Sequence, residues 1–253
     1  MNRVRTLIIS FIFIAFLNPF ARSQAYVSVS DLCYQAYTKG KVELWEQALS
    51  SAVEMHQGTD SDSSLHQLIL VQYGFTAYCI SEKQKERAEE ILAAAYGNLD
   101  YLMAKDAENA EYIALKAAFL AFELNIHPLK MTKLAPASIE LTDLAFKKDS
   151  SLLMSLSCKA NMLNFTPRIF GGNPDRAIPF YYRIIELFEN EDVYTKNDWR
   201  YINTLVILAD TYNKKKMYNE ACGVYERIIK HDSTINWVNN KLYPECRAKL
   251  ENE

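Results

Sequence analysis

Apolar residues recur at steps of three and four along most of the chain, which is the period of an amphipathic helix. One form of this pattern occurs five times: an alanine, an apolar or aromatic residue four positions later, and another apolar residue three positions beyond that. The five occurrences are Ala48/Ala52/Met55, Ala88/Leu92/Ala95, Ala137/Leu141/Leu144, Ala177/Tyr181/Ile184 and Ala221/Tyr225/Ile228. The leading alanines are 40, 49, 40 and 44 residues apart. Because a small residue lets a neighbouring helix approach closely, the pattern predicts a repeated array of packed helices.

The pattern and the turn residues between its segments predict five antiparallel helix pairs within one helical repeat domain, residues 26–253. The predicted pairs cover residues 29–57, 63–104, 107–148, 150–190 and 196–231. A terminal segment, residues 233–251, is expected to cap the apolar face of the last pair, as helical arrays require. The chain has only 7 glycines and 7 prolines, which is little turn punctuation for a sandwich or barrel. The predicted fold class is therefore all-α, an α-solenoid.

The first 25 residues have the features of a cleavable signal peptide. Arg3 and Arg5 precede an eleven-residue apolar run at 7–17, and Ser23 and Ala25 supply the small residues of a cleavage site. The run is short for a membrane-spanning helix, which needs roughly 20 apolar residues. An uncleaved anchor is the alternative. We expect an exported protein, periplasmic or extracellular, that is soluble after cleavage and has no membrane span in the mature chain.

The segment LVILADTYNKKKMYNEACGVYERII, residues 205–229, carries the sharpest repeat. A first helix with large residues and one small residue, Ala209 followed by Tyr212, precedes a second helix headed by Ala221 and Tyr225. This arrangement resembles the tetratricopeptide repeat. The resemblance extends to FGGNPDRAIPFYYRII, residues 170–185, because exported bacterial members of that family often place a GG-N/D-P loop before the second helix of a pair. Repeats of 40 to 49 residues exceed the family's 34 and imply longer helices and loops.

In such an array the first helices form a concave face on which peptides or other ligands usually lie. With Ala160 and Ala209 as the small core residues, the fourth and fifth pairs place an amide-rich set on this face: Asn161, Asn164, Asn203, Val206, Asp210 and Asn213. With Gly74 in the same role, the second pair adds the aromatic residues Phe75 and Tyr78. Asparagine amides offer both donors and acceptors to a peptide backbone. The alternative is that the asparagines are a solvated helix face and the aromatics ordinary core.

Candidate chemistry changes this picture little. Gly171 and Gly172 are not followed by the lysine and hydroxyl residue of a phosphate-binding loop, whereas Asn173 and Pro174 form a typical helix start. We therefore predict a turn, with a positive φ at Gly172 and no phosphate bound. The four histidines are scattered and no hydrolase motif is present. We predict no catalytic residues, no metal site, no cofactor and no enzyme activity.

The net charge argues against a nucleic-acid partner, and the cysteines form no recognised motif. The net charge is −3 and the sequence pI is about 5.9, so no basic field favours nucleic acid. The five cysteines, Cys33, Cys79, Cys158, Cys222 and Cys246, form neither a CxxC motif nor a disulfide framework. We interpret them as small buried hydrophobes. One disulfide is the alternative, and the sequence does not identify its partners.

These observations predict a non-catalytic exported scaffold that binds a protein, a peptide or another extended ligand on a concave helical face. A small hydrophobic ligand is a second kind of occupant. The resemblance to exported tetratricopeptide proteins also allows a narrower function, as the partner of the substrate-binding component in a TRAP-type transporter. The alternative from another class is an enzyme with an unrecognised site in the groove.

Expression with the native N-terminus is expected to give a product that begins near Tyr26 in the soluble exported fraction, because the apolar run precedes a small-residue cleavage site. Intact-mass measurement of the purified protein identifies the first residue. A membrane-bound product that keeps residues 1–25 would contradict the prediction.

Overall fold

A computed structural model describes residues 28–190 and 197–252, so the predicted signal peptide, residues 1–25, lies outside the described residues. Within these two ranges the regular structure is helical, which confirms the all-α class. The eleven α-helices are α1 (Val29–Lys39), α2 (Val42–Thr59), α3 (Asp62–Ser81), α4 (Lys85–Lys105), α5 (Ala110–Ile126), α6 (Met131–Lys148), α7 (Leu153–Phe165), α8 (Pro174–Asn190), α10 (Trp199–Lys214), α11 (Tyr218–His231) and α12 (Tyr243–Glu251). None of the described helices combines the length and the apolar character that crossing a bilayer requires.

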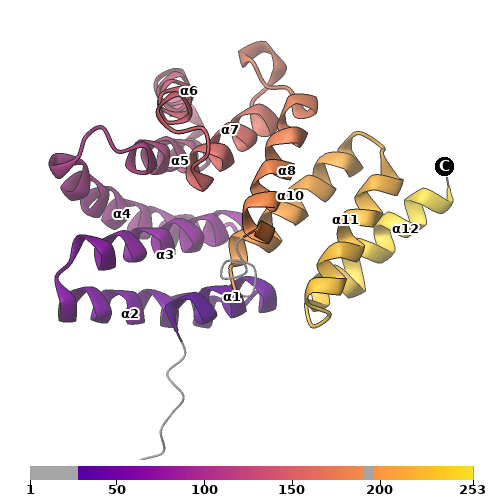
Figure 1. The fold of residues 1–253 in the computed structure, drawn as a ribbon, viewed down its shortest axis with the longest axis horizontal. Helices are drawn as coiled ribbons and strands as arrows, with labels where there is room; N and C mark the ends of the chain where they lie inside the picture. The colour runs from indigo at the N-terminus through magenta and orange to yellow at the C-terminus, as the bar shows by residue number, and fades with distance from the viewer. Residues whose placement is uncertain (1–27, 191–196, 253) are drawn as a thin grey trace, which may run out of the picture.

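Consecutive helices pack in pairs, α1 with α2, α3 with α4, α5 with α6, α7 with α8 and α10 with α11 (Figure 1). Short 3-10 turns, η1 (Pro128–Lys130) and η2 (Arg168–Phe170), lie in the α5–α6 and α7–α8 connections. A π-helical turn, η3 (Val238–Leu242), leads into α12, and both pack on α11. The five predicted pairs and the covering segment after the last pair are therefore present.

The alanines of the repeated pattern mark the helix contacts in four of the five pairs. Four of the leading alanines are fully buried: Ala48, Ala88, Ala177 and Ala221. Ala209, the small residue of α10, is also fully buried, and Tyr212 and Tyr225 are buried beside these alanines in sequence. Because none of these alanines extends beyond Cβ, the backbones of neighbouring helices can approach closely.

The third pair departs from the prediction. Ala137 is half-buried and Leu144 is 39% exposed, whereas Leu134, Thr142 and Ala145 are buried. The helix α6 begins at Met131 and contains Pro136, and its fully packed residues lie beside the predicted stripe. Ala137 is therefore less buried than the other four leading alanines.

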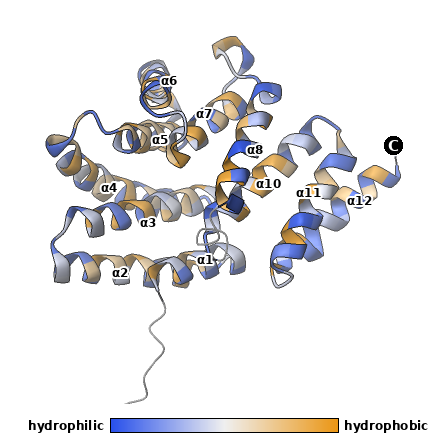
Figure 2. Cartoon of the chain, in the orientation of Figure 1, coloured by the Kyte–Doolittle hydropathy of each residue, from blue (hydrophilic) through white to orange (hydrophobic). Residues whose placement is uncertain are grey.

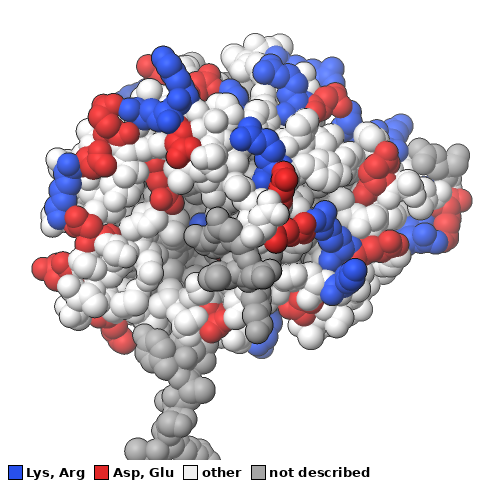
Figure 3. Space-filling view, viewed as in Figure 1, with Lys and Arg blue, Asp and Glu red and all other residues white. Residues whose placement is uncertain are grey.

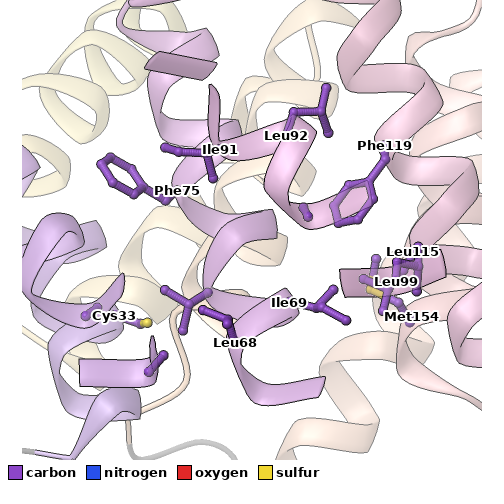
Figure 4. Close-up of a cluster of buried hydrophobic side chains, with 14 of the residues drawn as sticks. Cys33, Leu68, Ile69, Phe75, Ile91, Leu92, Leu99, Leu115, Phe119 and Met154 are labelled. Atoms are coloured by element: carbon purple, nitrogen blue, oxygen red, sulfur yellow. The ribbon is translucent and has the colours of Figure 1, made fainter. Parts of the chain in front are cut away.

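The buried apolar residues form two cores, with orange helix faces turned toward neighbouring helices (Figure 2). The first core joins the first three pairs and includes Ile69, Leu99 and Phe119 (Figure 4). The second joins the last two pairs and the cap. Trp199 of α10 belongs to the first core, whereas Tyr37 of α1 also packs against the second. The two cores therefore meet where α1 lies against α10.

A disulfide ties the cap to the last pair. Cys222 in α11 and Cys246 in α12 are bonded, with their Cα atoms 5.8 Å apart. The other three cysteines, Cys33, Cys79 and Cys158, are free and buried. The interpretation of all five as free buried thiols is thus wrong for one pair and right for the remaining three.

The α7–α8 connection is the predicted turn, although its glycines act differently from the expectation. Gly171, not Gly172, has the left-handed conformation, with φ of +93°. A Cβ on Gly172 would lie 1.6 Å from the carbonyl oxygen of Thr166, so this position requires glycine because of close approach. The side-chain oxygen of Asn173 accepts hydrogen bonds from the backbone N–H groups of Asp175 and Arg176 and caps α8.

Ala221→Leu is expected to lower the free energy of unfolding by ~1–3 kcal/mol or more, because the larger side chain must enter a closed helix contact. Lys230→Leu, at an exposed position of the same helix, is the matched control and should stay within about ±0.5 kcal/mol. Urea unfolding followed by circular dichroism measures both changes. Equal unfolding midpoints would show that α11 does not pack through the face that carries Ala221.

Candidate functional site

The first helix of each pair faces the inside of the array. Helix α1 contacts α3, α3 contacts α5, and α5 contacts α7; α10 packs on α8 and also reaches α1. We call α1, α3, α5, α7 and α10 the inner ring. Contacts therefore run from α1 through α3 and α5 to α7, and from α8 through α10 back to α1 (Figure 1). The contact between α10 and α1 brings the first and last helix pairs of the predicted array together.

An aromatic cluster lies where the ends of the inner ring meet. The Trp199 ring is centred 5.6 Å from Tyr37, 5.8 Å from Trp45 and 6.0 Å from Tyr73. Tyr37 also lies 5.9 Å from Trp237, which follows α11. We call these five residues the aromatic junction, and it contains all three tryptophans of the chain. Such ring pairs contribute ~0.5–1.5 kcal/mol each beyond the area they bury.

Hydrogen bonds between distant parts of the chain reinforce the junction. The Tyr37 hydroxyl donates to Oδ1 of Asn203 over 3.1 Å, and the Tyr34 hydroxyl donates to Oδ2 of Asp232 over 2.8 Å. The indole N–H of Trp237 donates to a backbone carbonyl in the last turn of α1 over 2.9 Å. Burial raises the pKa of both tyrosine hydroxyls, so they remain donors at neutral pH. Each bond contributes about 0.5–1.5 kcal/mol.

Gly74 of α3 makes room for this arrangement. A Cβ added there would lie 2.7 Å from Cη2 of Trp45 and 2.8 Å from Cζ2 of Trp199. Both neighbours are rigid aromatic rings, which cannot fold away as a flexible side chain would. The glycine is therefore needed for α10 to approach α3.

A small cavity remains inside the ring, between α3, α7, α8 and α10. Its volume is about 20 Å³, which holds one group of about the size of a water molecule. Its polar lining includes Tyr73, Ser157, Asn161, Tyr181, Arg200 and Asn203. Two of the predicted groove asparagines, Asn161 and Asn203, are therefore brought to one cavity from different helix pairs.

The cavity lining is rich in unused hydrogen-bond donors. Oδ1 of Asn161 accepts from the Tyr181 hydroxyl over 3.0 Å, and Oδ1 of Asn203 accepts from Tyr37. The Nδ2 groups of both asparagines and the Tyr73 hydroxyl donate to no other group of the described residues, and because none of them is among the fully buried polar atoms, each can also donate to water. Burial raises the pKa of the Tyr73 hydroxyl, which keeps its proton. The arrangement suits a ligand that brings hydrogen-bond acceptors.

The charged groups beside the cavity balance one another. Asp198 caps α10 by accepting from the backbone N–H of Arg200 over 2.9 Å, and it also accepts from the Arg200 guanidinium over 2.5 to 3.2 Å. Glu111 lies 3.3 Å from His66. Burial works to raise the pKa of the Glu111 carboxyl, but His66 and Arg200 together hold it below its usual range. Since carboxylates already accompany the guanidinium, a neutral acceptor such as a carbonyl suits the cavity better than an anion.

The remaining amide-rich residues do not line this cavity. Asn164 accepts from the Thr211 hydroxyl over 3.2 Å, and Nδ2 of Asn213 donates to the Tyr225 hydroxyl over 3.3 Å. These two asparagines therefore join helices, while Nδ2 of Asn164 and Oδ1 of Asn213 are buried without a hydrogen-bond partner.

The other two members of the amide-rich set also make contacts within the protein. Asp210 pairs with Lys214, one turn further along α10, at 2.6 Å. Val206 is half-buried against the second core. Of the α10 residues predicted to face a ligand, Asn203 therefore lines the cavity and the others do not.

The aromatic end of the predicted groove is also absent. Phe75 is fully buried and its ring is stacked 5.9 Å from Trp45, so its assignment to a ligand-binding face is wrong. Tyr78 lies near the α1–α2 turn, where its hydroxyl donates to the Gly40 carbonyl over 3.4 Å. The reason is the orientation of α3, because Gly74 faces the aromatic junction and the residue after it faces α2.

Reasoning from the sequence missed three residues of the site, Tyr73, Trp199 and Arg200. Tyr73 precedes Gly74, the predicted small residue of the second pair. Trp199 and Arg200 begin α10 directly after the capping residue Asp198. An aspartate followed by tryptophan and arginine at a helix start was the available signal, but it does not show which distant helices the ring will contact.

Groups that could support catalysis are sparse in the described part of the chain. Burial raises the pKa of the Cys33 and Cys158 thiols to about 12 and that of Cys79 to about 11, so they are poor nucleophiles at neutral pH. The same residues include no cluster of three or more histidine, cysteine or acidic side chains arranged to hold a metal ion.

No family model, curated protein or solved structure matches the chain.

Gly74→Ala is expected to destabilise the protein by ~1–3 kcal/mol, because the new methyl group would overlap two rigid rings of the aromatic junction. Gly97→Ala is the matched control in α4, where an added Cβ meets nothing within 4 Å. It should instead stabilise the helix by about 0.4–1 kcal/mol. Urea unfolding followed by tryptophan emission reports both effects. Equal shifts in the two variants would contradict the role assigned to Gly74.

Proposed function

We propose that this chain is a non-catalytic exported binding scaffold of the tetratricopeptide type that holds a peptide segment at the inner ring. The observation that carries the proposal is the set of unused donors on Tyr73, Asn161 and Asn203, which three different helices bring to one cavity. A backbone carbonyl is the neutral acceptor that fits a space of about 20 Å³. The rest of the peptide would lie outside the cavity.

Two further observations support a binding role over catalysis. The free thiols have raised pKa values and are buried, and Arg200 is engaged by Asp198. An enzyme would need a nucleophile or an acid–base pair free to act at the cavity. The lining residues instead offer hydrogen-bond donors and aromatic surface, which are the features of a recognition site.

The disulfide supports export. A bond such as Cys222–Cys246 persists in oxidising compartments and is rare in the reducing cytosol. Together with the N-terminal apolar run, it favours a periplasmic or extracellular location for the scaffold.

Selection from a random peptide library, followed by titration of the enriched peptides, tests the proposal. We expect binding that persists when the peptide ends are acetylated and amidated, because the cavity accepts an internal carbonyl. The variants Asn161→Asp and Asn203→Asp keep the bond to the tyrosine hydroxyl but replace an N–H donor with an acceptor. Each should weaken binding by about tenfold or more. The peptide carbonyl loses a hydrogen bond from the amide, and it is also repelled by the new carboxylate oxygen.

Asn240→Asp is the matched control, because Asn240 is exposed and lies in the π-helical turn η3. It should bind as the unmodified protein does. If no peptide is enriched, or if the two cavity variants bind with unchanged affinity, the inner ring is not a peptide site.

A further inference from the structure

The connection between α7 and α8 projects apolar side chains into solvent. Ile169 is 85% exposed, Phe165 is 56% exposed and Phe170 is 52% exposed. They lie within six consecutive residues around η2, at the upper edge of the molecule (Figure 1). Exposed large apolar side chains gathered on one short segment mark a contact site more often than isolated ones do.

The backbone of this loop is hydrogen-bonded within the loop itself. The N–H groups of Phe170 and Gly172 donate to the Pro167 carbonyl, that of Gly171 donates to Arg168, and that of Asn173 donates to Leu163 over 2.6 Å. Four consecutive N–H groups therefore need no water. These bonds reduce the number of backbone donors that the tip would have to desolvate in an apolar environment, although the N–H groups of Arg168 and Ile169 are not among them.

Basic residues surround the tip. Lys214, at the end of α10, lies 5.7 Å above the Phe165 ring, and Lys215 pairs with Asp175 of α8. The α10–α11 turn is thus beside the loop, and the two segments share five cations: Arg168, Arg176, Lys214, Lys215 and Lys216. Three carboxylates accompany them, Asp175, Asp210 and Glu220. Figure 3 shows Lys and Arg atoms beside the white atoms of the projecting loop.

The cations are only partly neutralised. Asp210 pairs with Lys214 and Asp175 with Lys215. Arg168, Arg176 and Lys216 have no carboxylate partner among the described residues, so they remain available to an external anion. The surface around the tip is therefore positive, although the whole chain has a net charge of −3.

We propose that this loop attaches the protein peripherally to an anionic phospholipid surface. Ile169 and Phe170 would enter the boundary between headgroups and acyl chains, while the basic residues contact lipid phosphates. The alternative occupant, a protein partner, fits the shape less well. Stable protein interfaces use roughly 20–30 residues on each side, whereas this tip is convex and presents three apolar side chains. A fluid bilayer closes around such a tip without a preformed pocket.

Co-sedimentation with lipid vesicles tests the proposal. The protein is used as purified after the expressing cell has processed its N-terminus. We expect binding to phosphatidylcholine vesicles that contain phosphatidylglycerol, and little binding to phosphatidylcholine alone. High salt should release the protein, because screening weakens the attraction between exposed charges and headgroups. Ile169→Ser/Phe170→Ser should lower the bound fraction by about tenfold or more, as should Arg168→Glu/Arg176→Glu.

Leu129→Ser/Met131→Ser is the matched control, because it removes an exposed apolar pair from the α5–α6 connection, where Leu129 is 100% exposed. This variant should bind vesicles as the unmodified protein does, and circular dichroism checks that every variant is folded. The proposal is overturned if the unmodified protein does not bind anionic vesicles, or if the Ile169/Phe170 variant binds them equally well. Self-association that depends on Ile169 and Phe170, without vesicle binding, would assign the tip to a protein contact instead.

Discussion

The approach of Trp199 to Gly74 and Trp45 is the contact on which the rest of the inner ring depends. It brings the beginning of α10 against α3, so that α1 and α10 meet and their hydrogen bonds form. The constraint is steric and local, since a single Cβ at Gly74 would occupy the space of two ring edges. Its effect is long-range, because the contact joins two cores that would otherwise touch only through consecutive pairs. The aromatic junction is therefore the part of the array in which local packing determines overall arrangement.

This closure also determines what the inner face can bind. An open concave surface would accept a broad ligand along its length, whereas the closed ring leaves a cavity for one small group. The tyrosine hydroxyls that hold Asn161 and Asn203 in place also take up their carbonyl oxygens and leave their N–H groups free. The same hydrogen bonds that stabilise the fold thus leave donors at the cavity, and in the proposed site these donors would favour a ligand that carries acceptors.

The helix pairs were predictable from sequence because each depends on neighbours close in the chain. Alanines such as Ala88 and Ala177 lie on the predicted packed face of their helices, and both are fully buried in the structure. The helical signal is weaker at Ala137, which is half-buried, because the packed residues of α6 are Leu134, Thr142 and Ala145. The sequence also did not indicate that Phe75 is fully buried, because a glycine does not reveal which of its neighbours it faces. Trp199 and Tyr37 meet across more than 150 residues, and helical periodicity holds no information about a contact at that separation.

The meeting of α1 and α10 has a consequence for how such a protein can change through evolution. An open array of helix pairs can lengthen or shorten when a repeat is duplicated or lost, because each unit contacts only its neighbours. Here a duplicated pair would move Trp199 away from Gly74 and leave the buried faces of both ends uncovered. The number of units is therefore locked by geometry. Point substitutions around the cavity or on the outer loops leave the contact between α1 and α10 in place, whereas an added helix pair would break it.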